Sequence, residues 1–454
     1  MKVYVTDIIV QGLFGKYNHK INIPHSSDLK IIYGPNGVGK TKVLEIAKAV
    51  VSGNGEYLAQ VPFKSATIVL SDSSEYRAFR TKNDSSANEE LYFSYLGKDY
   101  SDPITEAHID ETQSFIKWVL DSTPWNKAPN NLWQNEKTNE VLTLDDLKKL
   151  YPAVHNNSKK RIQFNESLIY YVDAQRLSTK NKFLEDSTLN NRGIYFSLGS
   201  KDENQAIKSL SNIMRDMIWR AQRENSLISQ RLERTFPARL IKNSDSRSES
   251  PENPQQNEQD IISRYKKQQE INNKITKILD SSRRQNLGQN LIKLPERGMH
   301  SWELNLLDLF LQDSDEKTKP FNYLLKKIGL FEEIITSRLN NKSCEVSGEK
   351  GINIFWKDNS KVNIPLESLS SGEQHEIILM FYLLFMVKEN SLVLIDEPEI
   401  SLHVAWQLRF IPDIEKISEI TKSKFLISTH SPQIINGRNS IAQRLGDKNY
   451  SWDS

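Results

Sequence analysis

Short apolar runs separated by polar turns fill the first eighty or so residues, a pattern typical of β-strands. The runs lie at Val3 to Val10, Lys20 to Ile23, Leu29 to Tyr33, Ala66 to Leu70 and Glu75 to Thr81. A glycine-rich turn follows Tyr33, and after it apolar residues recur at helical spacing, on a face made by Val43, Leu44, Ile46, Ala47 and Val50. This region therefore predicts strands and, after the turn, a helix.

Between about residues 200 and 340 the apolar period lengthens to three or four residues, which predicts helices. One face holds Ile207, Leu210, Ile213, Met214, Met217 and Ile218, and another holds Ile271, Ile275, Ile278 and Leu279. Residues 243–260 are rich in Ser, Asn, Gln, Pro and Glu, so we expect a mobile loop there. The heptads are too irregular to predict a long coiled coil.

A further strand pattern lies before the helical region, at Leu168 to Val172. After residue 342 strand patterns return, at Ser343 to Val346, Ile352 to Trp356 and Val362 to Ile364. Because both ends of the chain carry strand and helix patterns, we expect an α/β domain that is split by the helical insertion and carries a small antiparallel β subdomain. The expected boundaries are residues 1–199 for the first half of this domain, 200–341 for the insertion and 342–454 for the second half.

The composition is that of an ordinary globular chain, with 37% hydrophobic residues and a formal net charge of +2. This charge permits contact with nucleic acid but does not argue for it. The single cysteine, Cys344, excludes a disulfide within the chain and favours a cytoplasmic location. The longest apolar stretches, Ile377 to Val387 and Leu392 to Ile395, are too short to span a bilayer, so we expect no membrane contact.

Residues 34–41 read GPNGVGKT and match the P-loop pattern, between a predicted strand and a predicted helix. In such a loop, glycines let backbone amides surround phosphates, and the N-terminus of the helix adds a positive potential. Lys40 would reach the β- and γ-phosphates of ATP, and the Thr41 hydroxyl would bind Mg²⁺. A chance match in a turn is the alternative, which the flanking strand and helix disfavour. We expect nucleotide contacts from Asn36, Gly37, Val38, Gly39, Lys40 and Thr41.

Two carboxylates end the apolar run from Leu392 to Ile395. Asp396 is placed to hold Mg²⁺, and Glu397 is placed as the general base that polarises the water attacking the γ-phosphate. A buried strand with acidic residues at its exposed end would look the same on its own. The P-loop elsewhere in the chain favours the catalytic interpretation.

Residues 369–374 read LSSGEQ and precede a predicted amphipathic helix. Ser370 and Gly372 would present a hydroxyl and backbone amides at the N-terminus of that helix, which is an anion site. A capping box formed by Ser370 and Glu373 is the alternative, and the motif on its own favours capping.

The order of these motifs, followed by STHSP at residues 428–432, resembles the ABC ATPase family, and more narrowly its SMC-like, RecF-like and OLD-like branch that handles DNA. The resemblance implies a homodimer in which Ser370 of one subunit contacts the γ-phosphate held by the P-loop of the other. It implies that His430 senses the γ-phosphate, and that Gln175 helps to bind Mg²⁺ and the attacking water. Residues 398–403 correspond to the loop that crosses the dimer interface.

Four patches of sequence are similar to the PtuA ATPases, which occur in Septu antiphage systems and beside some retrons. They are DAQRL at 173–177, RTFP at 234–237, LSSGEQHE at 369–376 and DEPEISLH at 396–403. This resemblance implies ATP and Mg²⁺ as cofactors, a homodimer or higher oligomer, and a separate HNH nuclease of the PtuB type as partner. DNA or retron nucleic acid would be a further ligand.

Three functions are compatible with these motifs. The first is an ATP-driven switch that regulates a partner nuclease in phage defence. The second is a DNA-repair ATPase of the RecF or SMC class that acts on DNA itself. The third is the ATP-binding subunit of a transporter. It is disfavoured by the sequences LSSGEQ at residues 369–374 and DEPE at residues 396–399, and by the size of the insertion.

Other candidate residues have plainer alternatives. Residues 313–315 have the spacing of a Toprim nuclease, but a polar loop is favoured there. Only about 24 residues follow His430, too few for a Toprim domain, so we expect no DNA cleavage by this chain. A solvated basic face is favoured over a DNA contact for Arg231, Arg234 and Arg239. Core positions are expected for Trp118, Trp125 and Trp133.

Overall fold

The computed structural model describes residues 3–24, 27–82, 89–98, 104–107, 162–173, 203–246, 254–279, 298–358, 362–400 and 402–446, together with short stretches between 119 and 151. Its contacts divide the chain into two compact units. Unit 1 takes in residues 1–173, 388–398 and 422–454, and unit 2 takes in residues 174–387 and 399–421. Each unit therefore combines segments that are far apart in the sequence.

Unit 1 contains a parallel sheet of five strands in the order β11-β15-β16-β3-β17. Its strands are β3 (Leu29–Tyr33), β11 (Ile169–Asp173), β15 (Leu392–Asp396), β16 (Lys424–Ser428) and β17 (Ala442–Arg444). Every residue of β15 is buried, which explains why its sequence is an uninterrupted apolar run rather than an alternating one. The strand predicted at Leu29 to Tyr33 is confirmed, and the one at Leu168 to Val172 is shifted by one residue.

The register of this sheet aligns the ends of four strands. Asp173 of β11 pairs with Asp396 of β15. Asp396 pairs in turn with Ser428 of β16, and Ser428 with Ile32 of β3. Because the strands are parallel, their carboxyl ends lie at one edge, which is where open α/β sheets bind ligands. The glycine-rich turn after β3 and the carboxylates after β15 therefore meet at the same edge.

A second, antiparallel sheet of unit 1 has the strand order β2-β1-β4-β5-β6-β7. Its strands are β1 (Val5–Leu13), β2 (Tyr17–Asn22), β4 (Ser65–Leu70), β5 (Glu75–Lys82), β6 (Glu89–Leu96) and β7 (Ile104–Ala107). Helix α1 (Lys40–Ser52) shares one hydrophobic core with both sheets. Its predicted apolar face is confirmed, because this core includes Val43, Leu44, Ile46, Ala47 and Val50. Two shorter helices of this unit are α2 (Gly55–Gln60) and α10 (Pro432–Ile435).

The stretches between residues 119 and 151 include a small antiparallel sheet. It is formed by β8 (Trp125–Lys127), β9 (Leu132–Asn135) and β10 (Val141–Thr143). Trp125 and Trp133 are 1% and 2% exposed and belong to a small apolar cluster. Their prediction as core residues is confirmed, whereas Trp118 lies outside the described residues.

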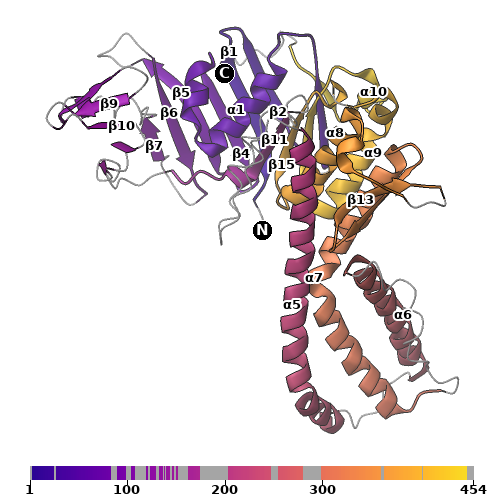
Figure 1. Cartoon of the computed structure of the whole chain (residues 1–454). Helices are drawn as coiled ribbons and strands as arrows, with labels where there is room; N and C mark the ends of the chain where they lie inside the picture. The colour runs from indigo at the N-terminus through magenta and orange to yellow at the C-terminus, as the bar shows by residue number, and fades with distance from the viewer. Residues whose placement is uncertain are drawn as a thin grey trace. The chain divides into compact units, whose positions relative to one another are not determined.

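Unit 2 includes the long helices α5 (Glu203–Ser246), α6 (Pro254–Leu279) and α7 (Ser301–Arg338). α5 and α7 lie side by side, and α6 packs along α7 (Figure 1). A small antiparallel sheet of β12 (Lys342–Ser347), β13 (Gly351–Trp356) and β14 (Asn363–Ile364) contacts these helices. It is followed in this unit by α8 (Ser371–Phe381) and α9 (Val404–Thr421). The predicted α/β fold with a helical insertion and a small antiparallel subdomain is confirmed.

The structure contradicts two predictions for the insertion, the first of them only at the ends of the predicted segment. The expected mobile loop at 243–260 is helical at both ends, because α5 continues to Ser246 and α6 begins at Pro254. Gln and Glu are good helix formers and proline fits the first helical position, so a polar composition does not exclude helix there. Residues 247–253 lie outside the described residues. Residues 313–315 lie within α7 rather than in a polar loop, since apolar residues at helical spacing continue on both sides of them.

Candidate nucleotide-binding site

The loop between β3 and α1 has a backbone that glycine adopts more readily than any other residue. Gly37 and Gly39 have φ angles of 84° and 90°, in the left-handed region. A Cβ atom on Gly39 would lie 2.5 Å from Cδ2 of Leu13, whereas a Cβ atom on Gly37 would meet no atom within 4 Å. The left-handed backbone therefore favours glycine at position 39, where a Cβ atom would also displace the Leu13 side chain. Gly37 borders the open space in which a phosphate could approach the backbone amides.

Lys40 lies within this loop, with only 5% of its surface exposed. Its Nζ atom donates to the carbonyl oxygens of Gly34 and Pro35 at 3.0 and 3.3 Å and lies 2.6 Å from Nε2 of His430. Because an ammonium group only donates, Nε2 of His430 accepts this hydrogen bond. The parallel sheet thus brings together two candidate residues that are 390 positions apart in the chain.

Asp396 and Glu397 follow each other in the chain but have different environments. The Asp396 carboxylate is buried and accepts hydrogen bonds from the hydroxyls of Ser428 and Tyr171, the second at 3.3 Å. Glu397 has a φ of 45°, and its amide donates to the carbonyl oxygen of Ser428 at 2.9 Å. A non-glycine residue in this conformation costs about 1 to 3 kcal/mol, and such strain clusters at functional sites. Oε1 of Glu397 lies 3.6 Å from Nε2 of His430.

These groups suit a magnesium nucleotide. Mg²⁺ is usually bound by one or two protein oxygens together with substrate phosphates and water. The Asp396 carboxylate at the end of β15 and the Thr41 hydroxyl in the first turn of α1 offer such oxygens. Lys40 and the N-terminus of α1 offer positive charge and amide donors for phosphate oxygens.

In the ranges that the structure describes, no group of three or more His, Cys, Asp or Glu side chains is arranged to hold a metal ion. Within the same ranges, no helix combines the length and the apolar character needed to cross a membrane.

Ser370 lies at the exposed N-terminus of α8 in unit 2. Its Oγ accepts from the Glu373 amide at 3.4 Å, and the Glu373 carboxylate accepts from the Ser370 amide at 3.0 Å, so the capping box is present. Lys342 donates to both carboxylate oxygens of Glu373, at 2.7 and 3.0 Å. A Cβ atom on Gly372 would meet no atom within 4 Å. The Ser370 hydroxyl also donates to the Glu373 carboxylate at 3.1 Å, so an anion at this exposed helix end would have to replace that carboxylate as the acceptor.

Two further candidate segments are only partly described. Gln175 lies outside the described residues, two positions after the end of β11, so its contact with Mg²⁺ and water stays a prediction. Residues 398–403 begin with a short 3₁₀ turn, in which Ile400 is exposed, and Ser401 lies outside the described residues.

Sequence reasoning did not single out three side chains that hold these loops and groups in place. His19 of β2 is buried and contacts the carbonyl oxygen of Val38 through Nε2 at 2.8 Å. Burial lowers the pKa of His19 despite an opposing effect of this hydrogen bond. The Gln374 side chain donates to three carbonyl oxygens of the turn that precedes α8. The third is Tyr171, whose hydroxyl donates to Asp396. Gln374 is the last residue of the LSSGEQ motif, whereas His19 and Tyr171 lie outside the motifs described above.

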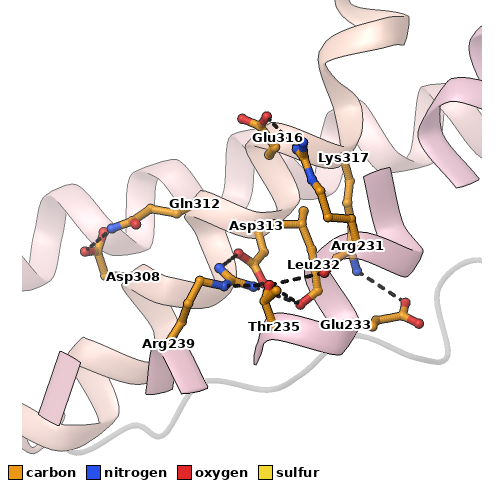
Figure 2. Close-up of polar contacts among 10 residues, drawn as sticks. All are labelled: Arg231, Leu232, Glu233, Thr235, Arg239, Asp308, Gln312, Asp313, Glu316 and Lys317. Atoms are coloured by element: carbon orange, nitrogen blue, oxygen red, sulfur yellow. Dashed lines mark hydrogen bonds and ion pairs between the residues drawn. The ribbon is translucent and has the colours of Figure 1, made fainter. Parts of the chain in front are cut away.

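The arginines of the insertion have acidic partners within unit 2. The guanidinium of Arg239 on α5 binds the carboxylate of Asp313 on α7 through both terminal nitrogens, one of them at 2.8 Å (Figure 2). Arg231 lies 3.4 Å from Glu316 of α7 (Figure 2). The face predicted to be solvated and basic therefore carries paired charges at these two positions.

The site and the fold define a class of protein. A P-loop and a pair of carboxylates meet at the carboxyl edge of a parallel sheet, which is the arrangement of a P-loop nucleotide-binding protein. The family model of the AAA ATPase domain matches residues 4–435. The chain belongs to this family.

Other similarities are more distant. A stretch of 112 residues is 30% identical to the protein ea59 of Escherichia phage lambda, and it covers 25% of this chain and 20% of that protein. The Smc head domain of Pyrococcus furiosus, bound to the C-terminal domain of ScpA, is similar at 16% identity and a TM-score of 0.34, covering 96% of this chain and 92% of that one. The SMC head domain of Thermotoga maritima is similar at 10% identity and a TM-score of 0.32, covering 95% and 91%.

Proposed function

We propose that the protein binds and hydrolyses ATP with Mg²⁺. The observation that supports this most strongly is the meeting of Lys40, Asp396, Glu397 and His430 at one edge of the parallel sheet. Lys40 and the P-loop amides would bind the β- and γ-phosphates, and Asp396, Thr41 and Gln175 would hold the metal ion, which supplies charge neutralisation of the phosphates.

In this proposal Glu397 is the general base and His430 contacts the γ-phosphate. Glu397 would accept a proton from the attacking water, and its constrained backbone keeps the carboxylate next to His430 before substrate arrives. Lys40 would exchange its hydrogen bond to His430 for bonds to phosphate oxygens. The strained conformation and the buried lysine thus prepare the site for a phosphate.

We further propose that two copies of the chain act together, each offering its Ser370 and Gly372 to the nucleotide on the other. The N-terminus of α8 is compatible with this role, because Ser370 is exposed and its hydroxyl could exchange the hydrogen bond to Glu373 for one to a phosphate oxygen. Residues 398–403 would lie at the interface between the copies. ATP would then be bound between the subunits.

The finer proposal is regulation of a separate HNH nuclease in antiviral defence, in the cytoplasm. It is supported by the four patches similar to PtuA ATPases, which include DAQRL at 173–177 and RTFP at 234–237. The alternative is a RecF- or SMC-like ATPase that acts directly on DNA. The pairing of Arg231 and Arg239 with acids of α7 favours the first, because paired arginines have less charge to offer phosphates.

The test is reconstitution. The purified chain is incubated with plasmid and single-stranded DNA, Mg²⁺ and ATP, alone and with a PtuB-type HNH protein. We expect ATP hydrolysis by the chain, no DNA cleavage by the chain alone, and cleavage once the HNH protein is added. Cleavage by the chain alone that survives the Asp396→Ala change and copurifies with it through several columns would contradict the division of labour. No hydrolysis under any condition would contradict the ATPase proposal itself.

A further inference from the structure

Both oxygens of the Asp396 carboxylate accept a hydrogen bond from a hydroxyl on a flanking strand. Ser428 of β16 donates to Oδ1, and Tyr171 of β11 donates to Oδ2 at 3.3 Å. All three side chains belong to residues that are at most 6% exposed. The carboxylate is therefore held from both sides before any ligand is present.

The sheet register fixes the two donors. Ser428 is the direct register partner of Asp396 on one side, and Asp173 is its partner on the other. Tyr171 lies two residues before Asp173, so its side chain projects from the same face of β11 as that of Asp173. The long tyrosine side chain can reach Asp396 across this two-residue offset along the sheet. The short serine side chain reaches it directly, because Ser428 lies beside Asp396 in the register.

Hydroxyl donors leave the charge of the carboxylate in place. A carboxylate has about four lone-pair sites, so two hydrogen bonds leave two sites for a cation or its water ligands. A lysine or arginine in either position would instead neutralise the group. A tyrosine hydroxyl, with an ordinary pKa of about 10, keeps its proton at neutral pH and continues to donate.

We propose that Tyr171 and Ser428 are positioning residues that orient the Asp396 carboxylate toward the divalent cation accompanying ATP. This inference rests on the proposed binding of magnesium nucleotide. It assigns a role to Tyr171, which no motif marks, and to Ser428, the first residue of the STHSP motif, to which the motif itself gave no role. It also predicts that their hydroxyls contribute to the cation affinity of the nucleotide complex and not to nucleotide affinity without a cation.

The test measures binding rather than turnover. The full chain is titrated with a fluorescent, non-hydrolysable ATP analogue in EDTA, and the Mg²⁺ concentration that gives half of the Mg²⁺-dependent binding signal is then determined. Removal of a group that orients a metal ligand typically weakens metal affinity about 10- to 100-fold. We expect Tyr171→Phe and Ser428→Ala each to raise this concentration about tenfold, with affinity in EDTA unchanged.

Tyr170→Phe is the matched control. Tyr170 projects from the opposite face of β11 and hydrogen-bonds the backbone of Lys388, so this variant loses a tyrosine hydroxyl without touching Asp396. It should keep the wild-type Mg²⁺ requirement. The double variant should show less than the product of the two single effects, because both hydroxyls act on one carboxylate.

Three outcomes would overturn the inference. The first is an unchanged Mg²⁺ requirement in Tyr171→Phe and Ser428→Ala while the wild type shows one. The second is equal weakening in EDTA and in Mg²⁺, which would assign the hydroxyls a purely structural role. The third is a wild type that binds no nucleotide either in EDTA or in Mg²⁺. This outcome would also contradict the proposed function, whereas the first two outcomes would leave the proposed function intact.

Discussion

The Nζ atom of Lys40 lies 2.6 Å from Nε2 of His430, so two proposed ligands of the γ-phosphate are hydrogen-bonded to each other. The same histidine nitrogen lies 3.6 Å from a carboxylate oxygen of Glu397. Three charged or polar groups of the proposed ATPase mechanism thus form one chain of contacts across the edge of the parallel sheet. Phosphate binding at the loop would break the first of these contacts.

Lys40→Ala and His430→Ala should therefore have different effects on binding. Lys40→Ala removes the charge that meets the phosphates, and we expect ATP affinity to fall at least about 100-fold, as the loss of a hydrogen-bonded charge pair implies. His430→Ala removes one contact to the γ-phosphate but also a competitor for Lys40, so ATP affinity should fall much less than in Lys40→Ala while turnover falls. Calorimetry and a phosphate-release assay separate the two.

Lys42→Ala is the matched control for the lysine. Lys42 lies in the same helix and bonds Glu45 at 2.7 Å and, at 3.3 Å, the hydroxyl of Tyr57. Its removal should leave ATP binding near the wild-type value. Equal loss of binding in Lys40→Ala and Lys42→Ala would show that the charge of the helix, and not the position of Lys40, matters.

The catalytic role of the Glu397 side chain and the strain of the Glu397 backbone can be tested by different substitutions. Glu397→Gln retains the backbone and removes the base, so we expect turnover to fall about 100- to 10,000-fold while ATP still binds. If ATP holds two copies together, gel filtration of this variant with ATP should show a larger species than without ATP. Turnover at the wild-type rate would place the base elsewhere.

Glu397→Gly should be equally inactive but more stable to heat than Glu397→Gln. Glu397 has a left-handed φ of 45°. This conformation lowers the stability of the fold by roughly 1 kcal/mol or more for a residue with a side chain, and glycine adopts it without that cost. Thermal unfolding without nucleotide measures the difference. A lower midpoint for the glycine variant would mean that contacts of the side chain outweigh the strain.

Much of this site follows from the sequence because phosphate chemistry demands particular residues at fixed spacing. The P-loop needs glycines and a lysine, and a carboxylate pair at the end of an apolar run marks the parallel strand beside it. The positions of Tyr171, Ser428 and His19 could not be predicted, because the sheet register and not a motif brings them to Asp396 and to the loop. The helical ends of residues 243–260 were missed because a polar composition is compatible with both loop and helix.

Mixed dimers test whether sites are shared between copies. Lys40→Ala and Ser370→Arg chains should each be inactive alone, because both sites of either homodimer lack one component. In a mixture, a heterodimer would have one intact site and one doubly defective site, and we expect partial recovery of hydrolysis at equimolar ratio. If both sites must act together, recovery will be absent. In that case an engineered cysteine at Ser370 should crosslink to a reactive ATP analogue bound by a Ser370→Arg chain.

Glu376 of α8 should make the protein less stable as pH rises. Its side chain is 1% exposed, and Nε of Arg338, at the end of α7, lies 3.9 Å from its Oε1 atom. Arg338 instead forms its close ion pair with Asp413 of α9. Burial raises the pKa of Glu376 from 4.5 to about 7, with Arg338 opposing this rise and Asp413 adding to it.

A raised folded-state pKa means that the protonated form of Glu376 stabilises the fold. This contribution is fully present below pH 4.5 and is lost as pH rises through about 7. Each pKa unit corresponds to about 1.4 kcal/mol, so the loss approaches roughly 3 kcal/mol at pH 8. Glu376→Gln keeps a neutral group of the same shape, and thermal unfolding should show it more stable than the wild type at pH 8 and nearly equal at pH 5.

Glu373→Gln, on the same helix, should behave in the opposite way. Burial raises the pKa of Glu373, but the hydrogen bonds from Lys342 and Ser370 outweigh burial and lower it. A lowered folded-state pKa gives stability that is present above pH 4.5 and lost as pH falls, so Glu373→Gln should be less stable than the wild type at pH 8. The two positions lie about one turn apart on α8, and both variants replace glutamate with glutamine. A stabilising effect of both at pH 8, or of neither, would contradict the assignment of Glu376 as the buried carboxyl that is neutral in the more stable form.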